Sequence, residues 1–424
     1  MRVIAAPGAI KGEVWAIPSK SHLHRLLICA ALADRQTKII CAHTAAEDIT
    51  ATIACLSALG AKIERAPEGF AVTPIDRTRL PAHAILPCGE SGSTLRFMLP
   101  VVAGLGVTGR FELAGRLPQR PLAPLDEQLT LGGVQLSWEA PGALRCEGKL
   151  DPGEYTLPGD ISSQYITGLL LALPLLGGES GLSVTQPIES EDYIAMTLQV
   201  MAAFGQNPPL TGGRYQIDSG AALKSPGELS AEGDWSNAAF WLCAGAMPSG
   251  DITCRGLSAN SSQGDKEVLA ILEQMGAHVS WEGDTLRVRE GIRRGIVIDG
   301  RATPDLIPVL CAVAALADGE TIVKNAARLR LKESDRITAT AQTLNALGAK
   351  VTEEESGLRI QGVAELRGGE VDSWGDHRIA MMAAIISAGC AGPVAITGGQ
   401  AVRKSYPTFW EELAALGKQV SIHE

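Results

Sequence analysis

Apolar side chains recur with a helical period in several stretches of this chain. In residues 49–56 they are spaced i, i+4, i+7, and residues 337–344 repeat that spacing. Side chains with this spacing share one face of an α-helix, so each stretch predicts a helix with one buried side. Gly60 and Gly348 follow these stretches. Glycine there suits the left-handed backbone that often ends a helix, and the residues after it predict a strand.

The helix-ending glycine also marks a repeat. Similar short segments end in a glycine every 69 to 73 residues, at Gly60, Gly132, Gly205, Gly276, Gly348 and Gly417. Ahead of each of them, small or N-capping residues precede a second apolar helix. A turn and a strand separate the two helices, as in residues 317–323.

Each repeat therefore reads helix, strand, helix, strand, strand. Six copies predict a mixed α/β protein with three repeats in each of two domains. An alternative is a solenoid of six stacked units that serves as a binding scaffold, although solenoid repeats are usually shorter, about 20–45 residues.

Composition narrows the class of protein. The chain has 424 residues, of which 46% are hydrophobic and 20% charged, and its formal net charge is −10. This length predicts two or three domains with large cores. The acidic balance argues against binding of nucleic acid along a broad basic surface.

Cysteine usage and hydropathy point to the cytoplasm. The nine cysteines are scattered and form no CxxC pair, which favours reduced thiols and no metal site. The first apolar run is broken by Pro7, Gly8 and Lys11, so no secretion signal is expected. Residues 379–397 are uncharged, but the serine, glycines and proline among them predict a helix and a strand rather than a membrane span.

Lysine and arginine residues gather where the predicted helices begin. A helix N-terminus offers unpaired N–H groups and the positive end of the helix dipole, so it attracts anions. Arginine binds carboxylate and phosphate through paired hydrogen bonds, and lysine adds a point charge. Cations at equivalent points of an acidic, repeated chain predict a pocket for a strongly anionic small molecule. The residues concerned are Lys20, Arg25, Arg96, Arg120, Lys332, Arg336, Arg378 and Lys404.

Motifs of several other enzyme classes are missing from the sequence. It has no Walker A pattern, no GxSxG and no HExxH, and its histidines are not spaced as metal ligands. An ordinary P-loop nucleotide site, an α/β-hydrolase nucleophile and a zinc protease site are therefore not expected.

Taken in their order along the chain, the motifs resemble the 5-enolpyruvylshikimate-3-phosphate synthase (3-phosphoshikimate 1-carboxyvinyltransferase) family, nearly from end to end. Each motif alone is weak, and their joint order is specific. They are residues 19–21 with Arg25, 92–96, 120–121, 162–164, 232–234, 304–305, 332–336, 376–378, and Lys404 before 406–407.

The resemblance implies an inside-out α/β barrel of two domains, built from six βαβαββ repeats with three per domain, and an active site in the cleft between the domains. One domain would comprise residues 1–17 with 229–424, and the inserted domain residues 18–228. A monomer is implied.

The resemblance also implies a reaction. The enolpyruvyl group of phosphoenolpyruvate would be transferred to the 5-hydroxyl of shikimate 3-phosphate, and phosphate would be released through a tetrahedral intermediate. The step belongs to aromatic amino-acid biosynthesis. It needs no cofactor and no metal, and its partners are the two small substrates.

Site residues follow from the resemblance. Asp305 would take the hydroxyl proton, Glu333 would handle the proton at the methylene carbon, and Lys20 would assist proton transfer. The residues implied to bind shikimate 3-phosphate are Lys20, Ser21, Arg25, Ser162, Ser163, Gln164, Ser190, Tyr193, Asp305 and Lys332. Those implied to bind phosphoenolpyruvate are Lys20, Gly92, Arg96, Arg120, Gln164, Arg336, Arg378 and Lys404.

Simpler roles stay open for some of these residues. Asp305 could cap a helix or interact with the helix dipole, and Glu333 could pair with the arginine three residues later. Ser162 and Ser163 could be plain N-caps. Arg96 could pair with a neighbouring residue instead of touching a substrate.

The chain departs from the family pattern at three places. Residues 90–91 are Glu-Ser where many members have Asn-Ala, Phe97 stands in place of a proline, and Arg328 stands in place of an asparagine.

Two rival functions stay open. One is UDP-N-acetylglucosamine enolpyruvyl transferase, although that family has Lys-Asn where this chain has Lys20-Ser21, and usually a cysteine in the residues before Arg120. The other is a scaffold that binds a phosphorylated ligand without turnover.

Overall fold

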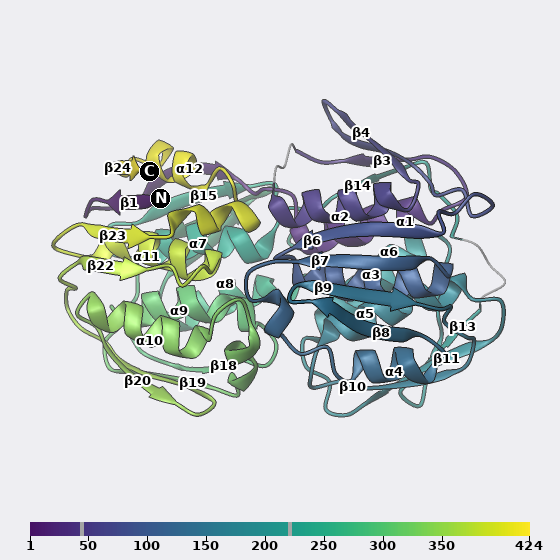
Figure 1. Ribbon diagram of the computed structural model, residues 1–424. Helices are drawn as coiled ribbons and strands as arrows, with labels where there is room; N and C mark the ends of the chain where they lie inside the picture. The colour runs from purple at the N-terminus through teal and green to yellow at the C-terminus, as the bar shows by residue number, and fades with distance from the viewer. Residues whose placement is uncertain (43–45, 219–222) are drawn as a thin grey trace. The chain divides into compact units, whose positions relative to one another are not determined.

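The computed structural model describes residues 1–42, 46–218 and 223–424. It divides into two compact α/β units (Figure 1). One unit consists of Met1–Ile17 and Glu232–Glu424, and is called the split unit below. The other consists of Pro18–Ala231, and is called the continuous unit.

The described part of the continuous unit has three four-stranded sheets and six α-helices. The first sheet has the strand order β14 (Glu228–Ser230), β3 (Thr37–Ile40), β5 (Gly69–Thr73), β4 (Lys62–Ala66). The second has the order β6 (His83–Gly89), β7 (Thr108–Leu113), β9 (Ala143–Glu147), β8 (Gln135–Ala140). The third has the order β10 (Glu154–Pro158), β11 (Ser180–Thr185), β13 (Arg214–Ile217), β12 (Leu210–Thr211). The helices are α1 (Lys20–Ala31), α2 (Glu47–Ala58), α3 (Gly92–Leu105), α4 (Leu125–Leu131), α5 (Ser163–Ala172) and α6 (Glu191–Ala203).

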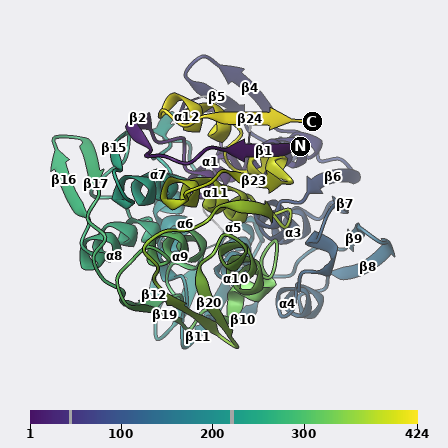
Figure 2. The ribbon, with the colours of Figure 1, turned by 90° about the vertical axis from the view of Figure 1, so that its left-hand side faces the viewer.

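The split unit is built in the same way. Its first sheet has the strand order β16 (His278–Glu282), β17 (Thr285–Arg289), β15 (Asp251–Arg255), β2 (Lys11–Trp15). The second has the order β18 (Val297–Asp299), β19 (Glu320–Lys324), β21 (Gly357–Gln361), β20 (Lys350–Glu354). The third has the order β22 (Gly369–Asp372), β23 (Val394–Thr397), β1 (Arg2–Ala5), β24 (Val420–His423). Its helices are α7 (Trp235–Ala246), α8 (Val268–Met275), α9 (Ile307–Ala314), α10 (Arg336–Ala346), α11 (His377–Ile386) and α12 (Phe409–Ala415). Figure 2 faces this unit and shows β1 between β23 and β24.

Each sheet contains one parallel strand pair and two antiparallel pairs. In the second sheet of the split unit, β18 and β19 are parallel, whereas β21 is antiparallel to both β19 and β20. Parallel neighbours need a crossover connection, and α9 supplies it between β18 and β19. The crossover places the start of α9 directly after a strand, and this is where charged residues lie.

In the split unit, three helices are buried on almost every side. All residues of α9 and α11 are buried, as are all residues of α7 except Ser236. Helices that are apolar all round belong in a core rather than on a surface. The other three helices bury one face only, as α10 does through Ile337, Ala341 and Leu344. In the continuous unit, α1, α3 and α5 are the largely buried helices.

The helix-ending glycines mostly adopt the predicted conformation. Gly60, Gly205, Gly276, Gly348 and Gly417 have φ between 80° and 109°. The prediction is wrong at Gly132, where φ is −81° and Gly133 takes the left-handed conformation instead, with φ 92°. Position 132 nevertheless requires glycine, because a Cβ atom there would lie only 2.6 Å from the Tyr155 hydroxyl oxygen.

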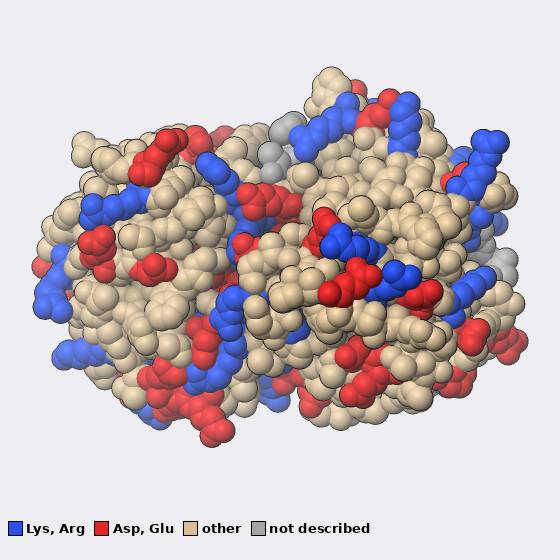
Figure 3. Space-filling view, viewed as in Figure 1, with Lys and Arg blue, Asp and Glu red and all other residues tan. Residues whose placement is uncertain are grey.

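The uncharged stretch 379–397 is a helix followed by a strand, as predicted. It contains most of α11 and all of β23. Among the described residues, no helix has both the length and the hydropathy needed to cross a bilayer. On the face shown in Figure 3, basic and acidic side chains are interspersed.

Candidate active site

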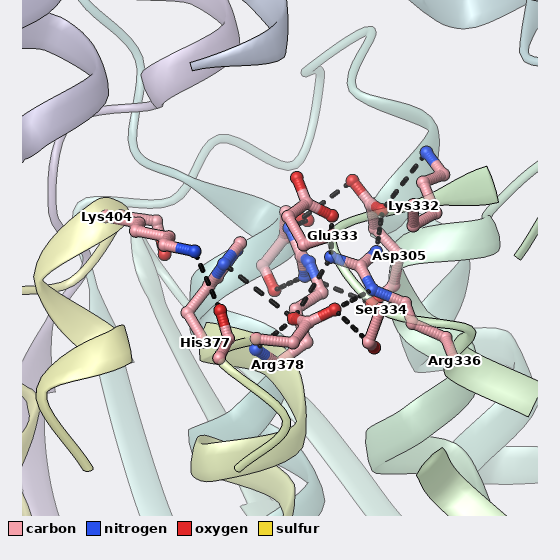
Figure 4. A network of polar contacts seen from close by, with 12 residues as sticks. Asp305, Lys332, Glu333, Ser334, Arg336, His377, Arg378 and Lys404 are labelled. Atoms are coloured by element: carbon pink, nitrogen blue, oxygen red, sulfur yellow. Dashed lines mark hydrogen bonds and ion pairs between the residues drawn. The ribbon is translucent and has the colours of Figure 1, made fainter. Parts of the chain in front are cut away.

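Arg336, the first residue of α10, lies at the centre of a carboxylate network in the split unit (Figure 4). It is 1% exposed. Nε donates to Asp376 Oδ2 at 2.8 Å, Nη1 to Asp305 Oδ1 at 2.7 Å and Nη2 to Glu333 Oε2 at 2.7 Å. Burial disfavours the charged guanidinium, but the three carboxylates outweigh it and raise the pKa of Arg336. The guanidinium therefore stays charged and holds two predicted catalytic carboxylates together.

Two helix N-termini position this network. Asp335 begins α10 by accepting hydrogen bonds from the N–H groups of residues 337 and 338, both at 3.2 Å. Asp376 begins α11 by accepting one from the Arg378 N–H at 2.9 Å, and it also accepts one from the Ser334 hydroxyl at 3.0 Å. The Asp376 carboxylate thus caps a helix and anchors Arg336 at once.

Asp305 lies in the short 3₁₀ helix η4 (Pro304–Leu306) ahead of α9. Its carboxylate is 2.7 Å from Arg336 Nη1, 3.4 Å from Arg378 Nη2 and 3.6 Å from Lys332 Nζ. Burial would raise the pKa of Asp305, but Arg378, Lys332 and Arg336 outweigh it and hold the pKa well below the usual value. The capping alternative is wrong, because Leu306 is the N-cap residue of α9.

The remaining predicted residues of the split unit surround the same network. Glu333 forms an ion pair with Arg336, which agrees with the alternative that it pairs with the arginine three residues later. Burial lowers the pKa of Lys332. Lys404, at the end of the 3₁₀ helix η7 (Gly399–Lys404), donates to the Gly375 carbonyl oxygen at 2.7 Å.

In the continuous unit, Arg25 joins three helices. Its Nε donates to the Thr197 hydroxyl at 2.7 Å, and Nη2 donates to the Thr167 hydroxyl at 3.2 Å and the Tyr193 carbonyl oxygen at 3.0 Å. Nη1 donates to the Ser21 carbonyl oxygen at 2.6 Å. Burial lowers the pKa of Arg25 to about 10, so it remains charged at neutral pH.

Lys20 is the first residue of α1 and forms an ion pair with Asp48 on α2, at 2.7 Å. Both side chains are largely buried. Ser19 caps α1 by accepting a hydrogen bond from the His22 N–H at 3.4 Å. The cap thus fixes the residue at which α1 begins, and the ion pair fixes the position of the Lys20 ammonium group.

Gly92 lies beside two arginines. Arg96 Nη1 donates to Gln164 Oε1 at 2.9 Å, and Gln164 Nε2 donates to the Ser93 hydroxyl at 2.9 Å. A Cβ on Gly92 would lie 2.8 Å from Arg96 Nη1 and 2.6 Å from Arg120 Nη1. Glycine at this position therefore lets both guanidinium groups reach the start of α3.

The predicted serines take different positions. Ser162 is the N-cap of α5, because its hydroxyl accepts a hydrogen bond from the Gln164 N–H at 3.3 Å. This agrees with the alternative that Ser162 is a plain N-cap. Ser163 is the first residue of the helix instead. Ser190 precedes α6 with φ 55°, a left-handed conformation uncommon outside glycine. Strained backbone of this kind is often found at functional sites.

The structure thus brings the predicted residues together in two groups, one in each unit. Sequence reasoning missed several residues that hold them in place: Asp48, Thr167, Thr197 and Ser236. Asp376 belongs to the motif 376–378 and is the predicted helix cap, but its pairing with Arg336 was not predicted. The threonines lie inside apolar helices and gave no signal.

At each of the three places where the chain departs from the family pattern, a residue makes a contact within the protein. Ser91 is the N-cap of α3 and accepts from the Thr94 N–H at 3.3 Å. The ring of Phe97 is buried, and its centroid lies 5.1 Å from the Arg25 guanidinium carbon. Arg328 donates to the Arg301 carbonyl oxygen at 3.1 Å.

Comparison with known proteins agrees with this arrangement. The family described as EPSP synthase (3-phosphoshikimate 1-carboxyvinyltransferase) matches residues 4–413. The 3-phosphoshikimate 1-carboxyvinyltransferase of Clostridium kluyveri is 40% identical over 415 residues, covering 98% of this chain and 97% of the relative. That of Clostridium beijerinckii is 41% identical over 422 residues, covering 97% and 96%.

Solved structures show the same fold. EPSP synthase from Acinetobacter baumannii has a TM-score of 0.79 and 26% identity, covering all of both chains. The enolpyruvyl transferase NikO from Streptomyces tendae has a TM-score of 0.76 and 18% identity, covering 99% of this chain and 98% of the other.

Proposed function

The chain belongs to the EPSP synthase family, and from this premise we propose that it is a 3-phosphoshikimate 1-carboxyvinyltransferase. It transfers the enolpyruvyl group of phosphoenolpyruvate to the 5-hydroxyl of shikimate 3-phosphate and releases phosphate. The observation that carries the proposal is the attachment of both Asp305 and Glu333 to Arg336. The reaction needs two proton transfers, and two carboxylates on one buried cation suit it.

In the addition step, the 5-hydroxyl oxygen attacks the central carbon of phosphoenolpyruvate. Asp305 accepts the hydroxyl proton, and Glu333, which enters the reaction as the carboxylic acid, delivers its proton to the methylene carbon. In the elimination step, the bond from that carbon to the phosphate oxygen breaks, and Glu333 takes back a proton from the methyl group. Atoms and charge balance, because the electrons of the broken C–H bond form the new double bond, phosphate leaves with the pair of the broken C–O bond, and Asp305 passes the hydroxyl proton to the departing phosphate. Both carboxyl groups thus return to their starting states.

The cations around Asp305 make its basicity depend on the substrates. In the protein alone, Arg378, Lys332 and Arg336 hold its pKa well below the usual range, so it is ionised but weakly basic. Anionic substrates that bind these cations share their positive charge, and the pKa of Asp305 then rises. Binding of substrate thus turns a salt-bridged carboxylate into a better proton acceptor.

The other predicted residues bind the anionic groups. Shikimate 3-phosphate is bound by Arg25 together with Ser21, Ser162, Ser163, Gln164, Ser190, Tyr193 and Lys332. The residues that surround phosphoenolpyruvate are Gly92, Arg96, Arg120, Gln164, Arg336, Arg378 and Lys404. Lys20 contacts both substrates. Five of these residues support the proposal by lying among the first two residues of an α-helix, where N–H groups and the helix dipole favour anions: Lys20, Gly92, Ser163, Arg336 and Arg378.

We propose further details of fold and setting. The chain forms six βαβαββ repeats in two inside-out barrels, with one domain of residues 18–228 and the other of 1–17 with 229–424. Six sheets with the same strand pattern and the two compact units support this. Because β14 pairs with β3 in the continuous unit, the boundary lies at residue 231 rather than at the proposed 228. The protein acts as a cytoplasmic monomer.

The test is phosphate release by the purified protein with phosphoenolpyruvate and either shikimate 3-phosphate or UDP-N-acetylglucosamine. Release that requires shikimate 3-phosphate, and falls at least a hundredfold in Asp305→Asn and Glu333→Gln, is expected (about 2.7 kcal/mol or more of barrier). Asp372→Asn, an exposed aspartate in the same unit, is the matched control. Release only with the nucleotide sugar would refute the assignment, and binding without release would favour a scaffold.

A further inference from the structure

Arg25 carries a buried positive charge that no acidic side chain balances. It is 2% exposed, and among the described residues its guanidinium pairs with no carboxylate. Its partners are neutral oxygens, namely the hydroxyls of Thr167 and Thr197 and the carbonyl oxygens of Ser21 and Tyr193. A buried cation without a counter-ion costs stability, and burial lowers its pKa to about 10. The arrangement suits an anionic ligand that supplies the missing charge.

The two threonine hydroxyls form a chain of hydrogen bonds with one direction. Thr197 Oγ1 donates to the Tyr193 carbonyl oxygen at 2.9 Å. Because a hydroxyl has one proton to donate, Thr167 must be the donor in the 2.8 Å contact between the two hydroxyls. Both protons are then used within the protein. The two hydroxyls therefore offer the guanidinium acceptors only, to Nε at 2.7 Å and to Nη2 at 3.2 Å.

The hydrogen bonds within the protein leave Arg25 one N–H for a ligand. A guanidinium has five N–H donors. Nε donates to Thr197, Nη2 to Thr167 and Tyr193, and Nη1 to Ser21. The second N–H of Nη1 has no acceptor among the described residues, and the first ties Nη1 to Ser21, which is itself assigned to shikimate 3-phosphate. Nη1 is therefore the atom through which Arg25 meets an anion.

The same contacts fix the plane of the guanidinium. Thr167 lies on α5 and Thr197 on α6, whereas Arg25 lies on α1. The ring of Phe97 on α3 adds a contact with the guanidinium carbon, 5.1 Å from the ring centroid. Rotation of the guanidinium within its plane would move Nη1, and the hydrogen bonds to the two threonines oppose that rotation.

We propose that Thr197, together with Thr167, is a positioning residue: the two hydroxyls hold the Arg25 guanidinium so that Nη1 faces an anionic group of shikimate 3-phosphate. This role rests on the proposed function, in which Arg25 binds that substrate. Both threonines are fully buried, so they act through Arg25 and not by touching a substrate. Their effect is confined to shikimate 3-phosphate.

The test compares steady-state kinetics of the wild type with Thr197→Val, Thr167→Val and Thr197→Ser. Valine keeps the branched shape of threonine and removes only the hydroxyl. We expect KM for shikimate 3-phosphate to rise about tenfold in Thr197→Val and about threefold in Thr167→Val, whose bond to Arg25 is longer. KM for phosphoenolpyruvate should change less than about twofold. Thr197→Ser restores the hydroxyl and should recover most of the loss.

A second background shows whether Thr197 acts through Arg25. Arg25→Lys keeps the positive charge but has no fork to be oriented. In that protein, Thr197→Val should change KM for shikimate 3-phosphate by less than about twofold more, because the interaction that it removes is already lost.

Thr37→Val is the matched control for loss of a buried hydroxyl. Thr37 lies on β3 in the same unit, is fully buried, and contacts the Ser225 hydroxyl at 2.7 Å. This variant should leave both KM values unchanged. If Thr197→Val fails to fold, Thr167→Val decides, since threonine and valine have similar helix propensities.

The outcomes are distinct. An active wild type whose valine variants keep a normal KM for shikimate 3-phosphate would overturn the positioning role alone. Equal changes in both KM values, or a full tenfold effect of Thr197→Val in the Arg25→Lys protein, would also overturn it. An inactive wild type would overturn the proposed function, and this role with it.

Discussion

Arg336 and Asp376 are joined by two hydrogen bonds, from Nε at 2.8 Å and from Nη2 at 3.3 Å, across 40 residues of sequence. Both side chains are essentially buried. This pairing fixes the plane of the guanidinium, so that its other hydrogen bonds reach Asp305 and Glu333. Asp376 therefore sets the geometry of two carboxylates that it does not contact.

Replacing Asp376 by asparagine tests that relationship. Asparagine is as good an N-cap as aspartate, so α11 should still begin at the same residue. The charge on the carboxylate is lost, however, and Arg336 keeps one weaker acceptor. We expect kcat/KM for phosphoenolpyruvate to fall about ten- to a hundredfold, equivalent to about 1.4–2.7 kcal/mol. Steady-state kinetics measures it, and a fall below about threefold would contradict the anchoring role.

Gly92→Ala should obstruct the phosphoenolpyruvate site. The added Cβ would lie 2.6 Å from Arg120 Nη1 and 2.8 Å from Arg96 Nη1, closer than van der Waals contact allows. Both guanidinium groups must shift, so we expect KM for phosphoenolpyruvate to rise about tenfold or more while the melting temperature changes little. Gly153→Ala is the matched control in the same unit, because a Cβ there meets nothing within 4 Å. Equal kinetics for both variants would refute the prediction.

The pH profile should reveal the change in basicity at Asp305. The acid limb of kcat/KM reports the free protein, where cations hold the pKa of Asp305 well below its usual value. The acid limb of kcat reports the complex, where substrate anions share those cations. We expect the kcat limb to lie at a higher pH, by about one unit or more. Initial rates from pH 3 to 9 measure it; limbs that coincide, or a reversed order, would contradict the mechanism.

Lys418 makes stability depend on pH outside the site. It is 4% exposed, donates to the Gly8 carbonyl oxygen at 2.5 Å, and burial lowers its pKa to about 8. Between pH 8 and the unfolded pKa of about 10.4, the unfolded chain binds the extra proton, so the free energy of unfolding rises with pH. Below pH 8 the cost of the buried charge is fully present.

Lys418→Met removes that titration and keeps an unbranched apolar stem. The stability of the wild type relative to the variant should increase by roughly 3 kcal/mol between pH 7 and pH 10.5. Urea unfolding of both proteins at three pH values measures the difference. A difference that stays constant with pH would show that Lys418 does not titrate abnormally.

Local sequence predicted those parts of the fold that depend on local chemistry. Gly60 and Gly348 end helices because their left-handed backbone is easy only for glycine, and Ser19 begins one because its side chain accepts a backbone N–H. The prediction was wrong at Gly132 because a second glycine follows it, and Gly133 takes the left-handed conformation in its place.

The partners of the site residues could not be predicted in the same way. Arg25 and Thr197 are 172 residues apart, and Thr197 lies in a helix whose pattern gives no sign of a polar contact. Motifs identify groups that perform chemistry, whereas the residues that orient those groups are chosen by tertiary structure.

The place of β1 has a consequence for the order of events during synthesis. β1 pairs with β23 and with β24, and Arg2 lies opposite His423. A ribosome makes β1 long before its partners β23 and β24, so β1 must wait, unpaired, until they emerge. The continuous unit has all its strands once residue 231 has been made. The middle of the chain can therefore fold while translation continues, and the split unit closes only when β23 and β24 emerge.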